Sequence, residues 1–125
     1  MIGLHTHKGA SLRIVKPQLP DEASDRVRST VFEVVGVQSD NPRKGHATAL
    51  MYQVCAEADR GAKVLMLMVT ENAEKLVKWY QRFGFKPTKD ELDTPVVMVR
   101  APVRLRVIPH MAIPANATRP NYCDS

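Results

Sequence analysis

The sequence lacks several features that would assign it quickly to a class of protein. Its 125 residues contain no apolar run long enough to cross a membrane, and Met1–Ala10 has no apolar stretch of the kind found in a signal peptide. The two cysteines, Cys55 and Cys123, lie far apart and form no metal-binding or redox motif. Cys55 falls on an apolar helical stripe, which favours a core residue over a nucleophile. We therefore expect a soluble, cytoplasmic protein with no metal and no membrane partner.

Two common phosphate-binding motifs are also absent. The sequence has no Gly-x-x-x-x-Gly-Lys-Ser/Thr loop and no three-glycine dinucleotide fingerprint. A net charge of +5 favours an anionic partner, but the basic residues are scattered and no run of four occurs. This distribution suits a small anionic ligand better than a nucleic acid.

The first 30 residues predict one strand and a polar connection. Residues 1–10 suggest a loose terminus, in which His5 and His7 lack the carboxylate or cysteine that would complete a metal site. Ser11–Lys16 predicts a strand. Asp21–Ser29 is polar and charged, so it predicts a connection or a short helical turn.

The most informative stretch combines a strand, a loop and a helix. The β-rich run Val31–Val37 enters a polar turn that contains Gly45, and a helix with an apolar stripe then extends to Gly61. Gly45 permits a positive φ or the close approach of a ligand, and the free N–H groups of the first helical turn favour an anion. A phosphate or pyrophosphate fits this turn, and an ordinary strand–helix turn with one glycine explains it equally well.

One carboxylate, Glu33, lies among valines in the strand Ser29–Gln38. Simple alternation divides the strand into one face with Val31, Glu33, Val35 and Val37 and another with Phe32, Val34 and Gly36. Glu33 is either half-buried with a raised pKa, as a general base would be, or at the sheet surface facing a cleft or water. The alternation alone favours exposure.

The remaining elements predict an α/β fold. Lys63–Val69 is almost continuously apolar, which is typical of a central strand covered on both faces. A second helix is expected at Ala73–Phe83, with Asn72 as its N-cap and Gly84 as a left-handed stop. Pro95–Arg100 predicts the last strand. This order favours parallel strands joined by right-handed crossovers.

Four short motifs follow one another along the chain: Val35-Gly-Val, Arg43-Lys-Gly-His-Ala-Thr-Ala-Leu, Asn72-Ala and Trp79-Tyr-Gln-Arg-Phe-Gly-Phe. In this order they resemble the GNAT superfamily of acyl-CoA-dependent N-acetyltransferases, over about residues 29–100. Gly45 and Ala47 match the family's loop pattern Gln/Arg-x-x-Gly-x-Gly/Ala, whereas Pro42 departs from it at the first position. The resemblance implies an α+β fold with a mixed sheet and two splayed parallel strands.

The resemblance also implies an acetyl-CoA site. Backbone groups of Val35 and Val37 would bind the pantetheine arm, and Asn72 would hydrogen-bond the same arm. Loop N–H groups would hold the pyrophosphate, from Arg43, Lys44, Gly45, His46, Ala47 and Thr48. Tyr80 matches the tyrosine that commonly protonates the departing thiolate.

The chemistry of amide formation suggests roles for Glu33 and Tyr80. An attacking amine must lose a proton, and Glu33 is the best-placed carboxylate to accept it. The leaving thiolate gains from a hydroxyl donor, which Tyr80 can supply from the inward face of its helix. The competing interpretation of Tyr80 is a core tyrosine whose hydroxyl reaches the surface.

The resemblance therefore implies an N-acetyltransferase that moves the acetyl group of acetyl-CoA directly to a primary amine. Residues 1–101 would form one domain, followed by an extension, 102–125, with an edge strand at 103–108. The short N-terminal part lacks the family's usual helix pair, so the acceptor side would be open or completed by the tail or by a second subunit in a homodimer. An open site suits a macromolecular amine. The alternative is a non-catalytic acetyl-CoA-binding or interaction module.

Overall fold

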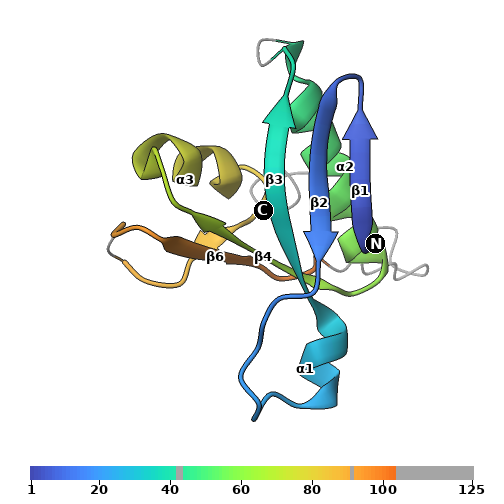
Figure 1. The fold of residues 1–125 in the computed structure, drawn as a ribbon, viewed down its shortest axis with the longest axis vertical. Coiled ribbons are helices and arrows are strands. Elements are labelled where there is room, and N and C mark those ends of the chain that lie inside the picture. Colours follow the sequence, from blue (N-terminus) through green and yellow to red (C-terminus); the bar gives the residue numbers. More distant parts are fainter. Residues whose placement is uncertain (42–43, 91, 104–125) are drawn as a thin grey trace, which may run out of the picture.

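The computed structural model describes residues 1–41, 44–90 and 92–103. Within these residues, three helices accompany a six-stranded sheet (Figure 1). The elements in chain order are β1 (Gly3–His7), β2 (Ala10–Val15), α1 (Asp25–Thr30), β3 (Val31–Ser39), α2 (His46–Arg60), β4 (Val64–Val69), α3 (Ala73–Gln81), β5 (Lys86–Pro87) and β6 (Val96–Arg100). The strand order in the sheet is β1-β2-β3-β4-β6-β5.

The N-terminus forms a β-hairpin. β1 pairs antiparallel with β2 along its whole length. Lys8 and Gly9 join the two strands with φ angles of 49° and 89°, the two left-handed conformations of a type I′ turn. The prediction of a loose terminus is wrong, because β1 is a paired strand along which half-buried and exposed residues alternate. The sequence conceals this pattern, since glycine and histidine hold the half-buried positions and the one large apolar side chain, Leu4, is exposed.

Gly36 introduces a bulge into β3. The register between β2 and β3 shifts after Val35, and β3 has one residue more than β2 in this interval. Gly36 accommodates the bulge with a φ of 64°. The bulge reverses the alternation, so Val37 packs against the same core as Val34. The predicted faces are thus right up to Val35 and wrong for Val37.

β3 and β4 run parallel but are paired over a short length. Val31–Glu33 lie opposite Val64–Met66, while β3 continues to Ser39 and β4 to Val69 without further pairing between them. We call the paired part, Val31–Glu33 with Val64–Met66, the closed end. The separated part, Val37–Ser39 and Val69, is the open end.

The other neighbour of β4 is antiparallel. β6 pairs with β4 from Arg100 opposite Leu65 to Val96 opposite Val69, and β5 pairs with the outer edge of β6. The expected arrangement of parallel strands is therefore limited to the β3–α2–β4 unit. The sheet is mixed, which confirms the α+β arrangement implied by the family resemblance.

Helices α2 and α3 share one core with one face of the sheet. The side chains that α2 buries follow the predicted stripe and are Leu50, Met51, Val54, Cys55 and Ala58. From α3, Val77 joins this core, followed by Phe83 and Phe85. Full burial of an aliphatic or aromatic side chain contributes about 1.5–3 kcal/mol, so this shared core is the main force that holds both helices on the sheet.

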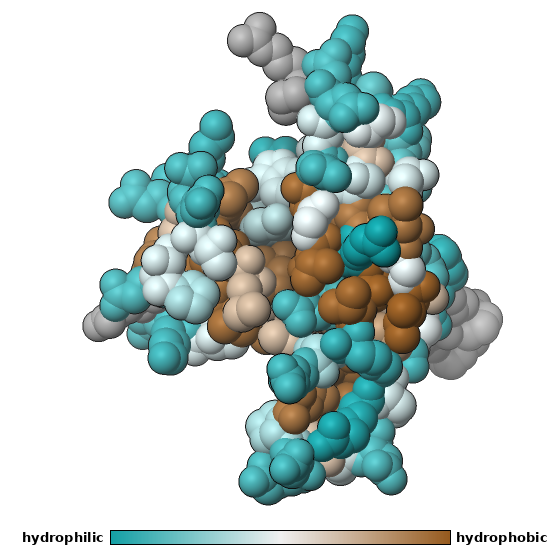
Figure 2. Space-filling view, in the orientation of Figure 1, coloured by the Kyte–Doolittle hydropathy of each residue, from teal (hydrophilic) through white to brown (hydrophobic). Residues whose placement is uncertain are grey.

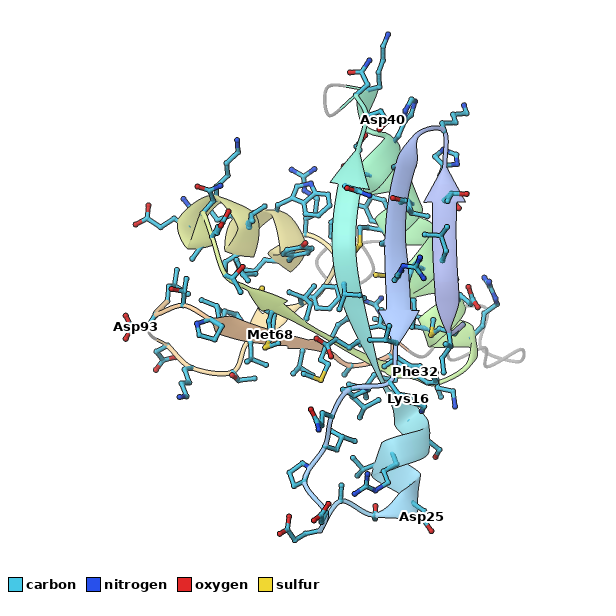
Figure 3. The ribbon with its side chains drawn as sticks, in the orientation of Figure 1. Lys16, Asp25, Phe32, Asp40, Met68 and Asp93 are labelled. Carbon is cyan, nitrogen blue, oxygen red and sulfur yellow. The ribbon has the colours of Figure 1, made fainter. Side chains whose placement is uncertain are left out.

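The opposite face of the sheet carries Glu33, Met66 and Met68. Only alternate residues of β4 are buried, namely Leu65, Leu67 and Val69. Met68 is 51% exposed, and Figure 3 labels its side chain. In the same orientation, Figure 2 shows apolar side chains gathered across this face. The prediction that β4 is covered on both faces is wrong for the described part of the chain, because a continuous apolar run also fits a strand with one open face.

The connection between β2 and β3 projects beyond the ends of the strands and contains α1 (Figure 1). This helix is the short helical turn predicted for the polar segment. It is capped by Ser24, whose hydroxyl accepts a hydrogen bond from the Val27 N–H at 3.2 Å. At its base, the Lys16 ammonium lies 3.9 Å from the centre of the Phe32 ring (Figure 3). The edge strand predicted at 103–108 lies outside the described residues, apart from Val103.

Candidate functional site

A cavity of about 860 Å³ occupies the open end. Its walls come from three elements that the sequence separates: the end of β3, the start of α2 and one side of α3. The residues lining it are Val37, Gln38, Ser39, Gly45, Ala47, Thr48, Glu74, Lys75, Leu76, Lys78, Trp79, Tyr80 and Arg82. The separation of β3 from β4 leaves room for this cavity, since paired strands would stand too close together.

The N-terminus of α2 forms one wall of the cavity. Gly45 precedes the helix with a φ of 72°, and no atom lies within 4 Å of the position that a Cβ would take there. The first helical hydrogen bond runs from the Ala49 N–H to the Gly45 carbonyl at 3.0 Å, so the N–H groups of residues 46–48 precede the helical ladder. The first turn has no acidic residue and no side-chain cap. These donors and the helix dipole suit an anionic ligand.

Tyr80 lines the cavity from α3. Its ring packs edge-on against Trp79, with 4.9 Å between ring centres, and against Phe85 at 5.9 Å. The second contact brings Phe85 back onto this helix after Gly84, whose φ of 98° confirms the predicted left-handed stop. Burial raises the pKa of the Tyr80 phenol above its ordinary value of 10. The phenol is therefore protonated at neutral pH and able to donate a proton.

Three basic residues on one side of α3 and at its C-cap also line the cavity, and the sequence patterns did not predict them. Lys75, Lys78 and Arg82 stand at i, i+3 and i+7, so one side of the helix presents them together. Glu74 adds one negative charge nearby. The i, i+3, i+7 spacing of these basic residues is visible in the sequence, but the other basic residues make the overall distribution look scattered.

Several predicted contact residues do not line the cavity. Val35 lies before the bulge and Lys44 is exposed. His46 turns toward β1, where its ring lies edge-on to His7 with 6.0 Å between the ring centres. Asn72 takes the N-cap position of α3, but with a left-handed φ of 51° and without a side-chain capping hydrogen bond. Arg43 lies outside the described residues.

Glu33 occupies the boundary between the closed and open ends. It is the last residue of β3 that pairs with β4, opposite Met66. Its side chain is half-buried on the face of the sheet opposite helices α2 and α3, away from the core formed by Phe32 and Val34. Glu33 therefore lies at the vertex where the strands separate, on the opposite side from the helices.

Two residues with reactive side chains serve other purposes. Cys55 is buried in α2, and burial raises the pKa of its thiol to about 11, so it is the unreactive core residue that its position predicts. His5 contacts the Met1 carbonyl with its Nε2 at 2.6 Å. In the described part of the chain, no three His, Cys, Asp or Glu residues gather as metal ligands.

A second cavity, of about 630 Å³, lies between α3 and the segment around Lys89. It shares Glu74 and Lys78 with the first but contains neither a helix N-terminus nor the Tyr80 phenol. Its charged lining is balanced, with Glu74 and Asp90 against Lys78 and Lys89, whereas basic residues outnumber Glu74 in the first. The open-end cavity is therefore the better candidate site.

Comparisons with known proteins find similar structures but no similar sequences. No protein-family model and no curated protein match the chain. The crystal structure of Ard1 from Thermoplasma volcanium matches with a TM-score of 0.56 and 16% identity, over 76% of this chain and 64% of that one. A GNAT-family acetyltransferase from Listeria monocytogenes gives a TM-score of 0.48 and 14% identity, over 74% and 57% of the two chains.

This chain spans less than two thirds of the length of either structure. At these identities the likeness establishes the fold. The chain has the fold of the GNAT acetyltransferases, as the motifs around Gly45 and Tyr80 imply. Before β3, the described residues hold a hairpin and the short α1 rather than a pair of long helices. No helix of the described residues is long and apolar enough to span a membrane.

Proposed function

We propose that the chain is an N-acyltransferase that uses acetyl-CoA to acetylate a primary amine. The observation that carries the proposal is a single cavity that brings an uncapped helix N-terminus together with a protonated phenol. The first can bind a diphosphate and the second can protonate a leaving thiolate. The GNAT fold supports this assignment, since its motif residues Gly45, Ala47 and Tyr80 all line the cavity.

The lining residues fit the chemistry of coenzyme A. The space over Gly45 is clear of other atoms, as the close approach of a diphosphate to backbone N–H groups requires. Lys75, Lys78 and Arg82 supply the positive charge that such a group needs. The edge of β3 beyond Glu33 is not paired with β4, which leaves backbone groups for the amides of a pantetheine arm. We assign cofactor binding to the predicted Val37, Gly45, Ala47 and Thr48, and keep Val35, Arg43, Lys44, His46 and Asn72 as weaker assignments.

In the proposed reaction, the neutral amine forms a C–N bond with the thioester carbonyl carbon while the C–S bond breaks. Tyr80 donates its proton to the leaving sulfur. The proton lost by the amine passes to Glu33 or to water. Glu33 is suited to this role by its place at the vertex of the two strands, although it faces the side opposite the helices.

The face of the sheet opposite helices α2 and α3 indicates what size of acceptor the site can admit. Met66 and Met68 lie on this face beside Glu33, and no described helix covers them. An amine presented by a large molecule can approach such a face without passing through a narrow channel. We therefore propose a macromolecular amine, such as a peptide N-terminus or a protein lysine, over a small diamine.

Two measurements on the full chain test the proposal. Calorimetry measures acetyl-CoA binding, and a thiol reagent follows coenzyme A release with a peptide N-terminus, a lysine peptide and a small diamine. We expect binding and acceptor-dependent release, fastest with the peptides. Binding without acceptor-dependent release would instead indicate a non-catalytic acetyl-CoA-binding module, and no binding would refute the site.

A further inference from the structure

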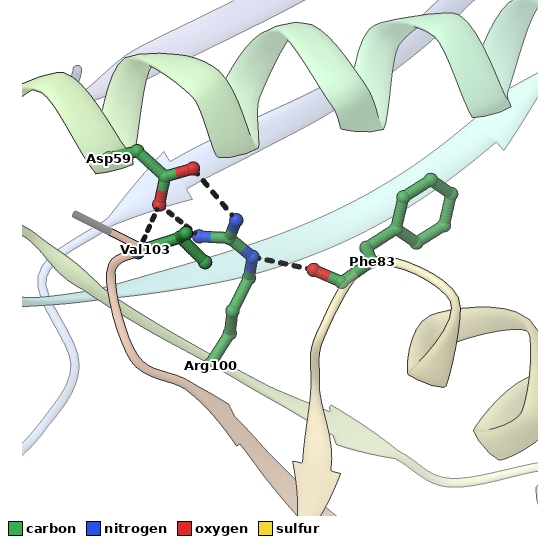
Figure 4. A network of polar contacts seen from close by, with 4 residues as sticks. All are labelled: Asp59, Phe83, Arg100 and Val103. Carbon is green, nitrogen blue, oxygen red and sulfur yellow. Dashed lines mark hydrogen bonds and ion pairs between the residues drawn. The ribbon is translucent and has the colours of Figure 1, made fainter. Parts of the chain in front are cut away.

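Arg100 links three elements near the closed end. The residue is only 5% exposed. Its Nε donates a hydrogen bond to the Phe83 carbonyl at 2.6 Å, and its Nη1 and Nη2 donate to the two Asp59 carboxylate oxygens at 2.8 and 3.0 Å (Figure 4). The Val103 N–H donates to the same carboxylate at 2.8 Å. One guanidinium thus joins β6 to the last turn of α2 and to the end of α3.

The surroundings of Arg100 suit a guanidinium specifically. The absence of a side chain at Gly84 leaves room for the guanidinium, because a Cβ at Gly84 would lie 3.4 Å from the Arg100 Nε. The planar guanidinium reaches the carbonyl with one nitrogen and the carboxylate with two others, each in a fixed direction. A lysine ammonium carries a similar charge but cannot hold both partners in one rigid plane.

A short chain of contacts connects Arg100 to Tyr80. The Phe83 N–H donates to the Tyr80 carbonyl at 3.0 Å, and the Phe83 carbonyl is the group that Arg100 holds. The Phe83 ring also packs edge-on against Tyr52 of α2, with 4.9 Å between ring centres. The last turn of α3, which carries Tyr80, is therefore fastened to α2 through both polar and aromatic contacts.

This connection can affect the cavity because the two ends of α2 have different neighbours. Its first turn, at Gly45, lines the cavity, and its last turn carries Asp59. Since a helix is stiff along its axis, fixing α3 to one end of α2 also fixes the distance between Tyr80 and the loop at the other end. A buried ion pair is seldom the best source of stability, but it does impose direction on the groups that it joins.

We propose that Arg100 and Asp59 are positioning residues for Tyr80: together they set the place of its phenol relative to the N-terminus of α2. The proposal rests on the acyltransferase function proposed above. It is separate from the binding of the cofactor, because neither residue lines the cavity. A displacement of about 1 Å at a reacting group can cost about 100-fold in rate, so a modest loosening is enough to be measured.

The test uses Arg100→Lys, Tyr80→Phe and the double variant in the full chain. We expect Arg100→Lys to lower kcat about 10-fold while the KM for acetyl-CoA changes less than about twofold, since the loop is untouched. In the Tyr80→Phe background the same substitution should lower kcat no further, because the group that it positions is already missing. An equal further loss in that background would overturn the proposal.

Ile14→Val is the matched control for stability. Ile14 is fully buried in β2 and far along the sequence from the pair, and the substitution costs about 1 kcal/mol. Assayed below the melting temperature, this variant should keep the wild-type kcat. A loss of kcat equal to that of Arg100→Lys would show that lowered stability alone explains the effect, and would overturn the proposal.

A spectroscopic measurement separates this inference from the proposed function. With ¹³C at the tyrosine Cζ, the Tyr80 resonance is assigned by its loss in Tyr80→Phe. We expect Arg100→Lys to move this resonance and to lower its titration midpoint toward the ordinary value of about 10, while Ile14→Val leaves both unchanged. If wild-type protein releases no thiol with any amine, the acyltransferase proposal fails, and the resonance alone decides: a shift supports the link from Arg100 to Tyr80, and an unmoved resonance refutes it.

Discussion

The two ends of the β3–β4 pair are filled in different ways. At the closed end, Leu65 is fully buried and Arg100 has partners for its Nε, Nη1 and Nη2 atoms. At the open end, the strands part around a cavity lined by a helix N-terminus, basic side chains and a phenol. Hydrogen-bonding groups are satisfied internally where the strands meet and are available where they separate.

This difference suggests that the two ends of one strand pair have separate roles, one structural and one in ligand binding. The closed end fixes the width of the gap, and the open end uses the gap for a ligand. Substitutions at the closed end should therefore act on stability, and on rate only through the position of Tyr80, whereas those at the open end should act directly on binding and rate. The following experiments test that contrast, from the largest expected effect to the smallest.

Asp59→Ala should have the largest effect, at the closed end. It leaves the buried Arg100 guanidinium without its anion, which costs about 3 kcal/mol in the free energy of unfolding, as urea denaturation would measure. Glu57→Ala is the control on the same helix, because Glu57 makes a longer ion pair, 3.7 Å from the Met1 amino group, with its side chain 40% exposed. Its cost should stay below about 1 kcal/mol. Equal small losses would show that the closed end does not depend on the pair.

Alkaline pH should destabilise the fold through Cys55, whose thiol interacts with Arg100 and Asp59. Burial raises the pKa of its thiol from 9.0 to about 11, with Asp59 raising it further and Arg100 opposing the shift. Between these pH values the unfolded chain loses the thiol proton while the folded chain keeps it. The contribution of this proton is complete below pH 9 and disappears as pH approaches 11, a loss of about 2 to 3 kcal/mol. Cys55→Ala should flatten this part of the stability–pH curve, and an unchanged slope would exclude Cys55 as its source.

Tyr80→Phe should affect catalysis with little effect on binding. Removing the proton donor should lower kcat about 100-fold, while the calorimetric Kd for acetyl-CoA stays within about twofold because the phenol is not among the N–H donors assigned to the diphosphate. Since burial raises the pKa of this phenol, the wild-type rate should show no loss from its ionisation below about pH 10. A variant with the wild-type kcat would remove Tyr80 from the mechanism.

Gly45→Val should give the smallest of these effects, at the open end. The side chain would enter the clear space over the N-terminus of α2, and a β-branched residue is strained at a φ of 72°. We expect acetyl-CoA to bind about 10-fold more weakly. Gly61→Ala, at the other end of α2 with a φ of −89°, should leave the affinity unchanged. Equal affinities in the two variants would contradict the loop assignment.

The sequence predicted the local features of this fold better than its long-range ones. The apolar stripe of α2 and the left-handed stop at Gly84 depend on neighbouring residues, and both were predicted correctly. The hairpin of β1 was missed because glycine and histidine hold its half-buried positions, while the apolar Leu4 is exposed. The bulge at Gly36 was missed because periodicity assumes an uninterrupted strand, so Val37 was placed on the wrong face.

The residues of the site were also predicted where they belong to local motifs and missed where they depend on long-range contacts. Gly45 and Tyr80 belong to recognisable local motifs, and the fold places both in one cavity. Nothing in the sequence pairs Asp59 with Arg100, which are 41 residues apart, since an ion pair leaves no periodic signal. The basic residues of α3 were likewise visible, but only the three-dimensional structure shows which way that side of the helix faces.

Trp79 gives this cavity a built-in optical reporter. It is the only tryptophan of the chain, it lines the cavity, and its ring lies 4.9 Å from that of Tyr80 and 5.0 Å from that of Phe83. Excitation at the red edge of indole absorbance therefore yields emission from one place in the molecule. Quenching of that emission during a titration would report ligand entry directly, on unlabelled protein.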